Sequence, residues 1–317
     1  MLDARRLKVL HEVARQGSFS AAADALLYTQ SAVSQQIAAL EREAGTLLVE
    51  RGRRGIRLTD AGRALVRHTE SILASLAAAE ADLEAIADLR GGRLRLASFA
   101  TAGATVVPLA VAEFAARHPG VELSLVEADP DESVPRVRAG ELELALDFEY
   151  STLPRSLDAP HDGIDRVHLL DDPMYVALPV GHPLAERANL RLAHLQAETW
   201  IQGCPGGMCG AMHRHACEAA GFTPRVGFES EDYGVVQGLV AAGVGVSLVP
   251  MLALSTVRED IVIRPLGPQT PVRRVFAAVA AGHRSGPTIA MLEILERAAR
   301  RLSQERPAIK APVSAAA

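Results

Sequence analysis

The spacing of apolar and polar residues between positions 30 and 44 predicts an amphipathic helix. Four apolar residues recur there at intervals of four, three and four, as they do on one helix face: Val33, Ile37, Leu40 and Ala44. Ser31, Gln35 and Arg42 fall on the opposite face, which the small Ala38 keeps slim. Gln and Arg side chains match the edges of bases, so this face fits a DNA major groove. The alternative is an ordinary surface helix with a solvated polar side.

The segments on either side of this helix favour the DNA interpretation. An alanine-rich segment at 18–27 predicts a shorter helix across a three-residue turn, the spacing of a helix-turn-helix, and Thr29 can cap the second helix. Glycines at 52 and 55 precede a short strand at 56–58 and indicate a tight hairpin. This hairpin carries four arginines: Arg51, Arg53, Arg54 and Arg57. It would clamp the phosphate backbone as a wing and add affinity that weakens with salt.

A single long helix is expected from Asp60 to Leu89, where proline is absent and apolar residues follow a heptad. The seam consists of Leu65, Thr69, Ile72, Leu76, Ala79, Leu83 and Ile86. It predicts pairing with a second copy of the chain, and hence an operator with inverted half-sites. The alternative is packing of the seam against the helix's own domain. Arg90-Gly91-Gly92-Arg93 then begins a linker.

From Leu94 onward, short β runs alternate with helical segments, which predicts α/β lobes with parallel sheets covered on both faces. The expected strands are 93–97, 121–126, 142–148, 164–170, 175–180, 199–202, 225–229, 246–249 and 273–280. The expected helices are 104–117, 132–139, a short one near 190–195, 211–220, 233–242 and 288–302. We expect two lobes, and we expect the last strand and helix to return to the first series and complete lobe one.

Two loops at strand ends are candidates for binding a small polar or anionic effector, because helix N-termini after strands offer free N–H groups. They are Ser98–Gly103 and Gln202–Gly207. Asp147, Glu231 and Asp232 lie at other predicted element ends and could line the same space. The effector contacts predicted in this way are Ser98, Ala100, Thr101, Phe148, Gln202, Gly203, Cys204, Tyr233 and Ser247. Plain turn or capping roles are the alternative for each residue taken singly.

The segment from Cys204 to Cys217 suggests further chemistry. Cys209, His213 and Cys217 recur every four residues along one helix face, near His215, and thiolates and imidazoles are zinc ligands. Cys204 or Cys209 at a helix N-terminus could instead be a reactive thiol. Against both, the spacing differs from that of common structural zinc sites, and buried free cysteines behave as small hydrophobes. We therefore favour structural or effector-loop roles, expect no metal or cofactor, and keep thiol-redox and metal-responsive regulation as alternatives.

Composition fits this plan and excludes several classes. The chain has 317 residues and a net charge of −5, unusually acidic for a DNA-binding protein, but residues 42–67 carry seven arginines and three acids. We expect a cytoplasmic protein without a membrane span, since no apolar run approaches bilayer length and three cysteines form no disulfide framework. Nucleophile-elbow, Walker, zincin and dinucleotide motifs are absent from the sequence, so we expect no enzyme; a hydrolase using Ser98 is a minor alternative.

The amino-terminal motifs resemble those of LysR-type transcriptional regulators. The resemblance rests on Gly17-Ser18-Phe19-Ser20, Ala22-Ala23, Leu26, Gln30, Ala32-Val33-Ser34, Gln36-Ile37, Leu40-Glu41, Gly45, Leu48, Arg51, Arg54, Leu58-Thr59 and Ala61-Gly62. Val49 departs from the usual Phe and affects packing more than base readout. More loosely, His182-Pro183-Leu184-Ala185 and the segment 243–250 resemble motifs of the LysR-type effector domain, which is itself similar to periplasmic solute-binding proteins. The spacing of the cysteines here differs from that in peroxide-sensing members.

The resemblance implies a winged helix-turn-helix domain (1–60), a dimerising linker helix (61–90), a two-lobed, doubly wound α/β effector domain (91–306) and a disordered tail (307–317). Lobe one would comprise 91–163 with 267–306, and lobe two 164–266. The expected partners are inverted-repeat operator DNA, a small-molecule effector between the lobes, and further copies in a homodimer or homotetramer. Together with the helix face, the resemblance names the expected DNA contacts: Ser18, Gln30, Ser31, Ser34, Gln35, Arg42, Arg51, Arg53 and Arg54.

Overall fold

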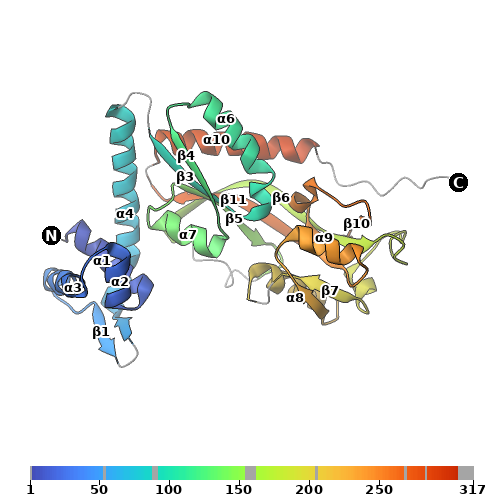
Figure 1. Cartoon of the computed structure of the whole chain (residues 1–317), viewed down its shortest axis with the longest axis horizontal. Helices are drawn as coiled ribbons and strands as arrows, with labels where there is room; N and C mark the ends of the chain where they lie inside the picture. Colours follow the sequence, from blue (N-terminus) through green and yellow to red (C-terminus); the bar gives the residue numbers. More distant parts are fainter. Residues whose placement is uncertain are drawn as a thin grey trace.

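The computed structural model describes residues 2–52, 55–87, 92–153, 162–203, 206–267, 270–282 and 284–305. It is elongated, with a small helical unit at one end, a long helix beside it, and an α/β region that fills the rest (Figure 1). The described helices include none that is both long and apolar enough to span a bilayer.

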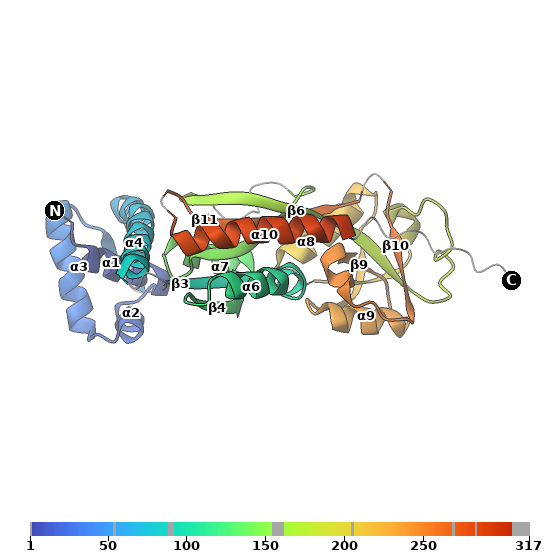
Figure 2. The same ribbon diagram turned by 90° about the horizontal axis from the view of Figure 1, so that it is seen from above.

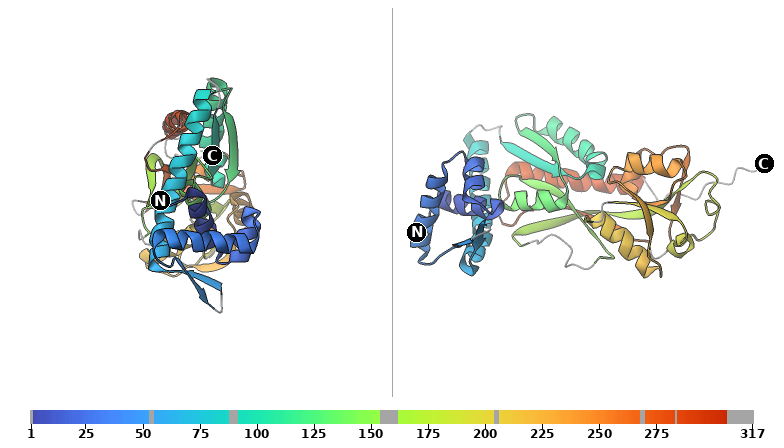
Figure 3. Two further views of the ribbon diagram at one scale, coloured as in Figure 1. Left: turned by 90° about the vertical axis from the view of Figure 1, so that its left-hand side faces the viewer. Right: turned by 60° about the horizontal axis from the view of Figure 1, so that its bottom comes forward.

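The amino-terminal unit comprises α1 (Ala4–Gln16), α2 (Phe19–Leu26), α3 (Gln30–Ala44), β1 (Val49–Gly52) and β2 (Gly55–Leu58). The strands form an antiparallel hairpin that projects from the helices (Figure 3). The predicted short helix, second helix and hairpin are therefore confirmed. Thr29 caps α3 by accepting the amide of Ala32 at 3.2 Å, and Gly45 ends α3 with a φ of 68°. The predicted stripe faces inward, because Val33, Ile37 and Leu40 are buried.

The long helix α4 (Asp60–Ala87) follows the hairpin directly, and the last predicted positions, 88 and 89, lie outside the described residues. Its first turn packs tightly on the unit, because a Cβ at Gly62 would lie 2.1 Å from the carbonyl oxygen of Leu48. The Thr59 hydroxyl donates to the carbonyl of Leu47 at 2.8 Å and accepts the amide of Gly62 at 3.0 Å. These contacts fix the direction in which α4 leaves the unit.

Lobe one contains β3 (Arg93–Ser98), α5 (Ala100–Gly103), α6 (Val106–Arg117), β4 (Glu122–Glu127), α7 (Pro130–Arg138) and β5 (Leu144–Tyr150). The carboxy-terminal β11 (Val272–Ala280) and α10 (Gly286–Glu305) return to it, as predicted. The strand order is β4-β3-β5-β11, with β3 parallel to both neighbours and β11 antiparallel to β5. Helices α6 and α10 lie side by side on one face, and α7 covers the other (Figures 1 and 2).

Lobe two contains η2 (Leu192–Leu195), β7 (Thr199–Gln202), α8 (Met208–Ala219), β8 (Arg225–Glu229) and α9 (Tyr233–Ala241). It continues with β9 (Ser247–Pro250), η3 (Met251–Ser255) and β10 (Ile261–Pro265). Strands β9 and β10 both pair antiparallel with β6 (Ile164–Pro179), and β7 pairs parallel with β8. Trp200 of β7 is 1% exposed in the core of this lobe. Strand β10, an edge strand, had not been predicted.

The prediction of separate strands at 164–170 and 175–180 is wrong, because β6 is one strand of 16 residues. Its first half pairs with β11 and its second half with β9 and β10, so β6 belongs to the sheets of both lobes. Asp171-Asp172-Pro173 resembles a turn in sequence, but Asp172 and Pro173 pair in register with Arg273 and Val272 of β11. The proposed residue limits of the two lobes stay a prediction.

Candidate DNA interface and effector cleft

The polar face of α3 is open to solvent. Gln30, Ser31, Gln35 and Arg42 are exposed, and Ser18 and Ser34 are half-buried. Helix α3 lies at the end of the molecule farthest from lobe two (Figure 2). The face that the sequence assigned to a major groove is therefore available to a duplex, although the individual contacts stay predictions.

Two sets of side-chain bonds hold α3 in position. Arg6 of α1 donates to the amide oxygen of Gln36 at 3.3 Å and forms an ion pair with Glu43. One carboxylate oxygen of Glu41 accepts the amides of Leu48 at 2.9 Å and Val49 at 3.2 Å, so α3 is tied to the start of the hairpin. A helix and hairpin fixed in this way present one composite surface.

The arginines of the hairpin can be placed only in part. Arg53, Arg54 and the side chain of Arg51 lie outside the described residues. Arg57 of β2 is exposed. The phosphate-clamping role of Arg51, Arg53 and Arg54 therefore stays a prediction from the sequence.

The apolar seam of α4 divides into two parts. Leu65 packs partly buried against the core of the amino-terminal unit, and Thr69 is fully buried. The following positions are open, since Ile72 is 39% exposed and Leu76 is 44% exposed. The side chains of Leu83 and Ile86 lie outside the described residues. Packing within the chain thus explains the first turns of the seam and leaves the middle turns without a cover among the described residues.

Further along α4, Glu70 links the amino-terminal unit to lobe one. Its carboxylate lies 3.7 Å from Nε2 of His11 in α1 and 3.6 Å from Nε of Arg138 in α7. All three side chains are mostly buried. The position of the helical unit relative to lobe one therefore depends on a charged contact as well as on the chain connection.

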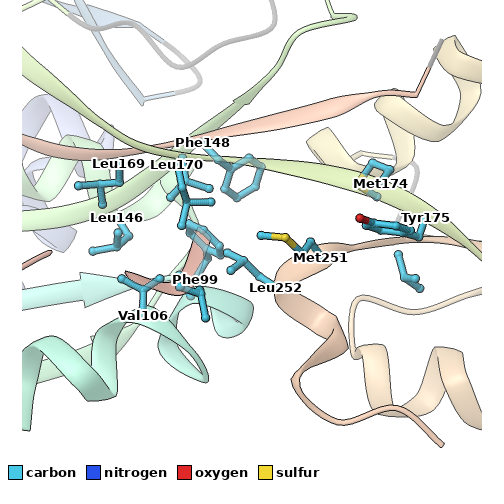
Figure 4. Packing of buried hydrophobic residues seen from close by; sticks show 14 of the residues in the cluster. Phe99, Val106, Leu146, Phe148, Leu169, Leu170, Met174, Tyr175, Met251 and Leu252 are labelled. Carbon is cyan, nitrogen blue, oxygen red and sulfur yellow. The ribbon is translucent and has the colours of Figure 1, made fainter. Parts of the chain in front are cut away.

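A cleft of about 610 Å³ opens between the two lobes. It is lined from lobe one by Phe99, Ala100, Thr101, Ala104, Glu127, Ala128, Asp129, Phe148 and Arg273, and from lobe two by Cys209, Glu231, Asp232, Tyr233, Gly234, Gln237, Leu252, Ala253, Ser255 and Thr256. We call it the interlobe cleft. Phe99 and Phe148 meet edge to face at 4.9 Å, and Leu252 of η3 lies opposite Phe99 (Figure 4). The cleft therefore has an apolar interior and a charged rim.

Of the predicted effector contacts, Ala100, Thr101, Phe148 and Tyr233 line this cleft. The hydroxyls of Ser98 and Ser247 are buried and donate to the carbonyls of Phe99 at 3.1 Å and Ile201 at 2.7 Å. Gln202 and Gly203 are also buried and do not line the cleft, nor does Asp147, which pairs with Arg166 at 2.7 Å. Cys204 lies outside the described residues. The structure thus brings together four of the nine predicted residues.

The main polar group of the cleft, Arg273, was missed by the sequence analysis. Its side chain is 2% exposed, and Nε and Nη2 donate to one carboxylate oxygen of Asp172 at 2.9 and 2.6 Å. Nη2 also donates to the Thr101 hydroxyl at 2.7 Å, and the guanidinium lies 4.8 Å from the centre of the Phe99 ring. Burial is the largest single effect and opposes the charge, but the combined interactions with Asp172, Tyr150, Tyr233 and Cys209 outweigh it and raise the pKa of Arg273 above the usual value.

The alternation of β11 was the signal that could have revealed Arg273. It shares a strand face with Val275, Ala277 and Val279, all of which are buried. A charged residue in phase with a buried apolar face needs a partner, and Asp172 is the residue opposite it on β6.

Acidic residues from both lobes surround the rim of the cleft. Glu127 and Asp129 belong to lobe one, and Glu231 and Asp232 precede α9 of lobe two. Asp232 caps α9 by accepting the amide of Gly234 at 2.7 Å, so its role is at least partly structural. Burial, and then repulsion from Glu231 and Asp131, raises the pKa of Asp129. The two rims therefore repel each other through like charges.

The two cysteines of lobe two that the structure describes, Cys209 and Cys217, occupy protected positions. The thiol of Cys209 lies 3.3 Å from the Tyr150 hydroxyl, and burial raises its pKa. Burial raises the pKa of Cys217 to about 12 and lowers the pKa of His213 to about 4, although Nε2 of His213 lies 3.2 Å from the carbonyl of Leu248. Within the described residues, no three His, Cys, Asp or Glu side chains form a group that could hold a metal ion. These environments therefore do not favour the thiol-redox or metal-responsive alternatives over regulation by a small-molecule effector.

Comparisons with known proteins agree with this architecture. Residues 4–63 match the model of the bacterial regulatory helix-turn-helix protein, lysR family, and residues 87–300 match the LysR substrate binding domain. A probable HTH-type transcriptional regulator of Synechococcus elongatus, LrrA, is 32% identical over 94% of this chain and 98% of its own length.

Two solved structures share this fold over nearly the whole chain. CbnR, a LysR-type regulator solved in complex with its target DNA, is 26% identical with a TM-score of 0.54 and covers 94% of this chain and 100% of its own. A full-length OxyR variant of Pseudomonas aeruginosa has a TM-score of 0.65 and covers 95% of both chains, and at 24% identity it supports the fold alone. The chain therefore belongs to the LysR family of DNA-binding transcriptional regulators.

Proposed function

We propose that this regulator reads an inverted-repeat operator with α3, clamps phosphates with the hairpin, and responds to a small molecule held in the interlobe cleft. The observation that carries this proposal is the polar outer face of α3, where Gln35 and Arg42 are exposed at the end of the molecule. Gln and Arg can form paired hydrogen bonds with base edges, whereas hairpin arginines contact backbone phosphates without reading sequence.

The regulatory step follows from the position of the cleft. An effector that contacts both lobes favours the closed arrangement by the difference between its affinities for the two states. Because Glu70 joins α1 and α4 to α7 of lobe one, a movement of this lobe would reach the amino-terminal unit. The effector therefore changes the spacing of the DNA-reading heads in a homodimer or homotetramer. We place the protein in the cytoplasm, where it meets the chromosome, and assign it no catalytic activity, as its relatives are regulators.

The test selects binding sites from a random duplex library with the full-length protein and measures their affinities by fluorescence anisotropy. The selected sequences should contain inverted half-sites. Gln35→Ala should cost about 1–3 kcal/mol at selected sites and relax the preference at one position of each half-site. Arg54→Ala should weaken all duplexes alike and lower the slope of affinity against salt by about one per site.

Glu218→Gln, on the exposed side of α8 in lobe two, is the matched control and should change neither quantity. If the library yields no preferred sequence, or Gln35→Ala binds selected and random duplexes as the parent does, the proposed reading helix is wrong.

A further inference from the structure

The charge of the interlobe cleft restricts which ligands it accepts. Its lining contains four carboxylates, Glu127, Asp129, Glu231 and Asp232, and one guanidinium, Arg273. The charge of Arg273 is balanced by Asp172, which is fully buried behind it. The cleft therefore presents a negative rim to solvent. A purely anionic ligand, one of the possibilities expected from the sequence, would meet repulsion from both lobes.

The inner end of the cleft offers a different group. Nε and Nη2 of Arg273 are engaged with Asp172 and Thr101. Nη1 makes no hydrogen bond with the described residues, and it is not fully enclosed by the protein. Since Arg273 lines the cleft, its remaining N–H groups are accessible to an acceptor inside. A guanidinium in an apolar surrounding prefers a carboxylate as that acceptor.

The rim and the inner end belong to one cleft, because Asp129, Glu231 and Arg273 all line it. Asp129 interacts electrostatically with both Glu231 and Arg273, and Cys209 with all three. A cation between Asp129 and Glu231 would replace repulsion across the cleft with attraction to both rims. A ligand with an ammonium group there and a carboxylate at Arg273 would satisfy both ends and draw the lobes together.

We propose that the effector is a small zwitterion of the α-amino acid type, with its carboxylate at Arg273 and Thr101 and its ammonium between Asp129 and Glu231. Phe99, Phe148 and Leu252 provide an apolar wall for its side chain. The volume of about 610 Å³ falls within the range of roughly 300–1,000 Å³ typical of small-molecule sites. This inference rests on the proposed function, because it specifies the ligand of the same cleft.

The experiment measures binding to the full-length protein by thermal shift and calorimetry. The probes are the twenty amino acids, and for each that binds, the 2-oxo acid and the amine that share its side chain. At least one amino acid should raise the melting temperature, and both of its counterparts should bind at least tenfold more weakly. Asp129→Asn and Glu231→Gln should each lower the affinity for the amino acid about tenfold and reduce the ratio of its affinity to that of the 2-oxo acid. Arg273→Lys should reduce its advantage over the amine.

Asp131→Asn removes the same charge two residues from Asp129, at a position that does not line the cleft, and should keep the parental affinity. The inference is wrong if no amino acid binds, if a 2-oxo acid binds as tightly as its amino acid, or if Asp129→Asn and Glu231→Gln both keep the parental affinity. The duplex selection distinguishes these failures from failure of the proposed function. If sequence-specific DNA binding is retained while no amino acid binds as expected, the proposed regulatory function stands and only the proposal of a zwitterionic effector is wrong.

Discussion

Asp172 and Arg273 form the most enclosed ion pair among the described residues, with side chains 0% and 2% exposed. Asp172 also accepts the amide of Leu252 at 3.0 Å, so one carboxylate joins β6, β11 and η3. Such a pair contributes little net stability when intact, because desolvation offsets the attraction. Removing one member of the pair lowers the stability strongly, because the remaining charge stays buried without its partner.

Asp172→Ala should therefore lower the free energy of unfolding by about 3–5 kcal/mol, measured by urea denaturation of the full chain. Asp171→Ala is the matched control. Asp171 pairs with His168 at 2.9 Å, but its side chain is 62% exposed, and such pairs contribute about 0–1 kcal/mol. Equal losses for the two variants would contradict the importance assigned to the buried pair.

The environment of Asp129 predicts that the stability of the protein depends on pH. The folded-state pKa of Asp129 is raised by burial and by Glu231, so its charged form opposes folding. The unfavourable contribution is absent below the unfolded pKa and appears as the pH rises through the folded pKa. Asp129→Asn should therefore stabilise the protein at pH 7, and this gain should shrink as the pH falls toward 4. Asp129 makes no side-chain cap bond to α7, so the variant loses no cap.

Urea unfolding of the parent and Asp129→Asn between pH 4 and 7 measures this difference. A variant at pH 7 that is no more stable than the parent would show that the carboxylate is not under repulsion.

At the scale of elements, the junction of hairpin and long helix depends on one glycine. Gly62→Ala would place a methyl group against the carbonyl of Leu48 and force α4 away from the hairpin. We expect a loss of stability greater than that of Gly45→Ala, together with weaker DNA binding. Gly45 has a φ of 68° but no atom within 4 Å of an added Cβ, so its replacement costs only backbone strain, about 1–2 kcal/mol.

Thermal unfolding and operator affinity of the two variants check this prediction. The idea fails if Gly62→Ala unfolds at the parental temperature.

The elements were predictable where the pattern is local. The stripe of α3, its cap at Thr29 and the glycines of the hairpin all lie within a few residues of what they determine. Strand β6 was divided wrongly because Asp171-Asp172-Pro173 carries a local turn signal, which pairing with a strand about 100 residues later overrides. The cleft was only half predictable for the same reason, since Arg273 acquires its partner and its neighbours from other segments of the chain.

At the scale of the whole molecule, the exposed middle of α4 predicts the assembly. Ile72 and Leu76 present apolar side chains one turn apart, without a cover among the described residues. Replacing both with Glu should dissociate the oligomer, because charges would be buried at its interface. The molar mass from light scattering should fall to that of one chain, 33.6 kDa, and operator affinity should drop because the two heads act separately.

Leu109→Glu is the control, since Leu109 is 45% exposed and belongs to α6 of lobe one rather than to this seam. A double variant of α4 that keeps the parental mass would place the interface elsewhere.

The shared strand β6 also limits how the two lobes can move. A 16-residue strand common to both sheets is a continuous, hydrogen-bonded connection rather than a flexible linker, so the two lobes cannot move independently of each other. Rotation of one sheet would instead be passed to the other as torsion. Two irregularities interrupt the pairing of β6 with β11: Pro173 has no N–H to donate, and the register shifts between Val275 and Phe276. We expect β6 to bend at these positions. We therefore expect the signal to be a small twist, amplified by the length of α4.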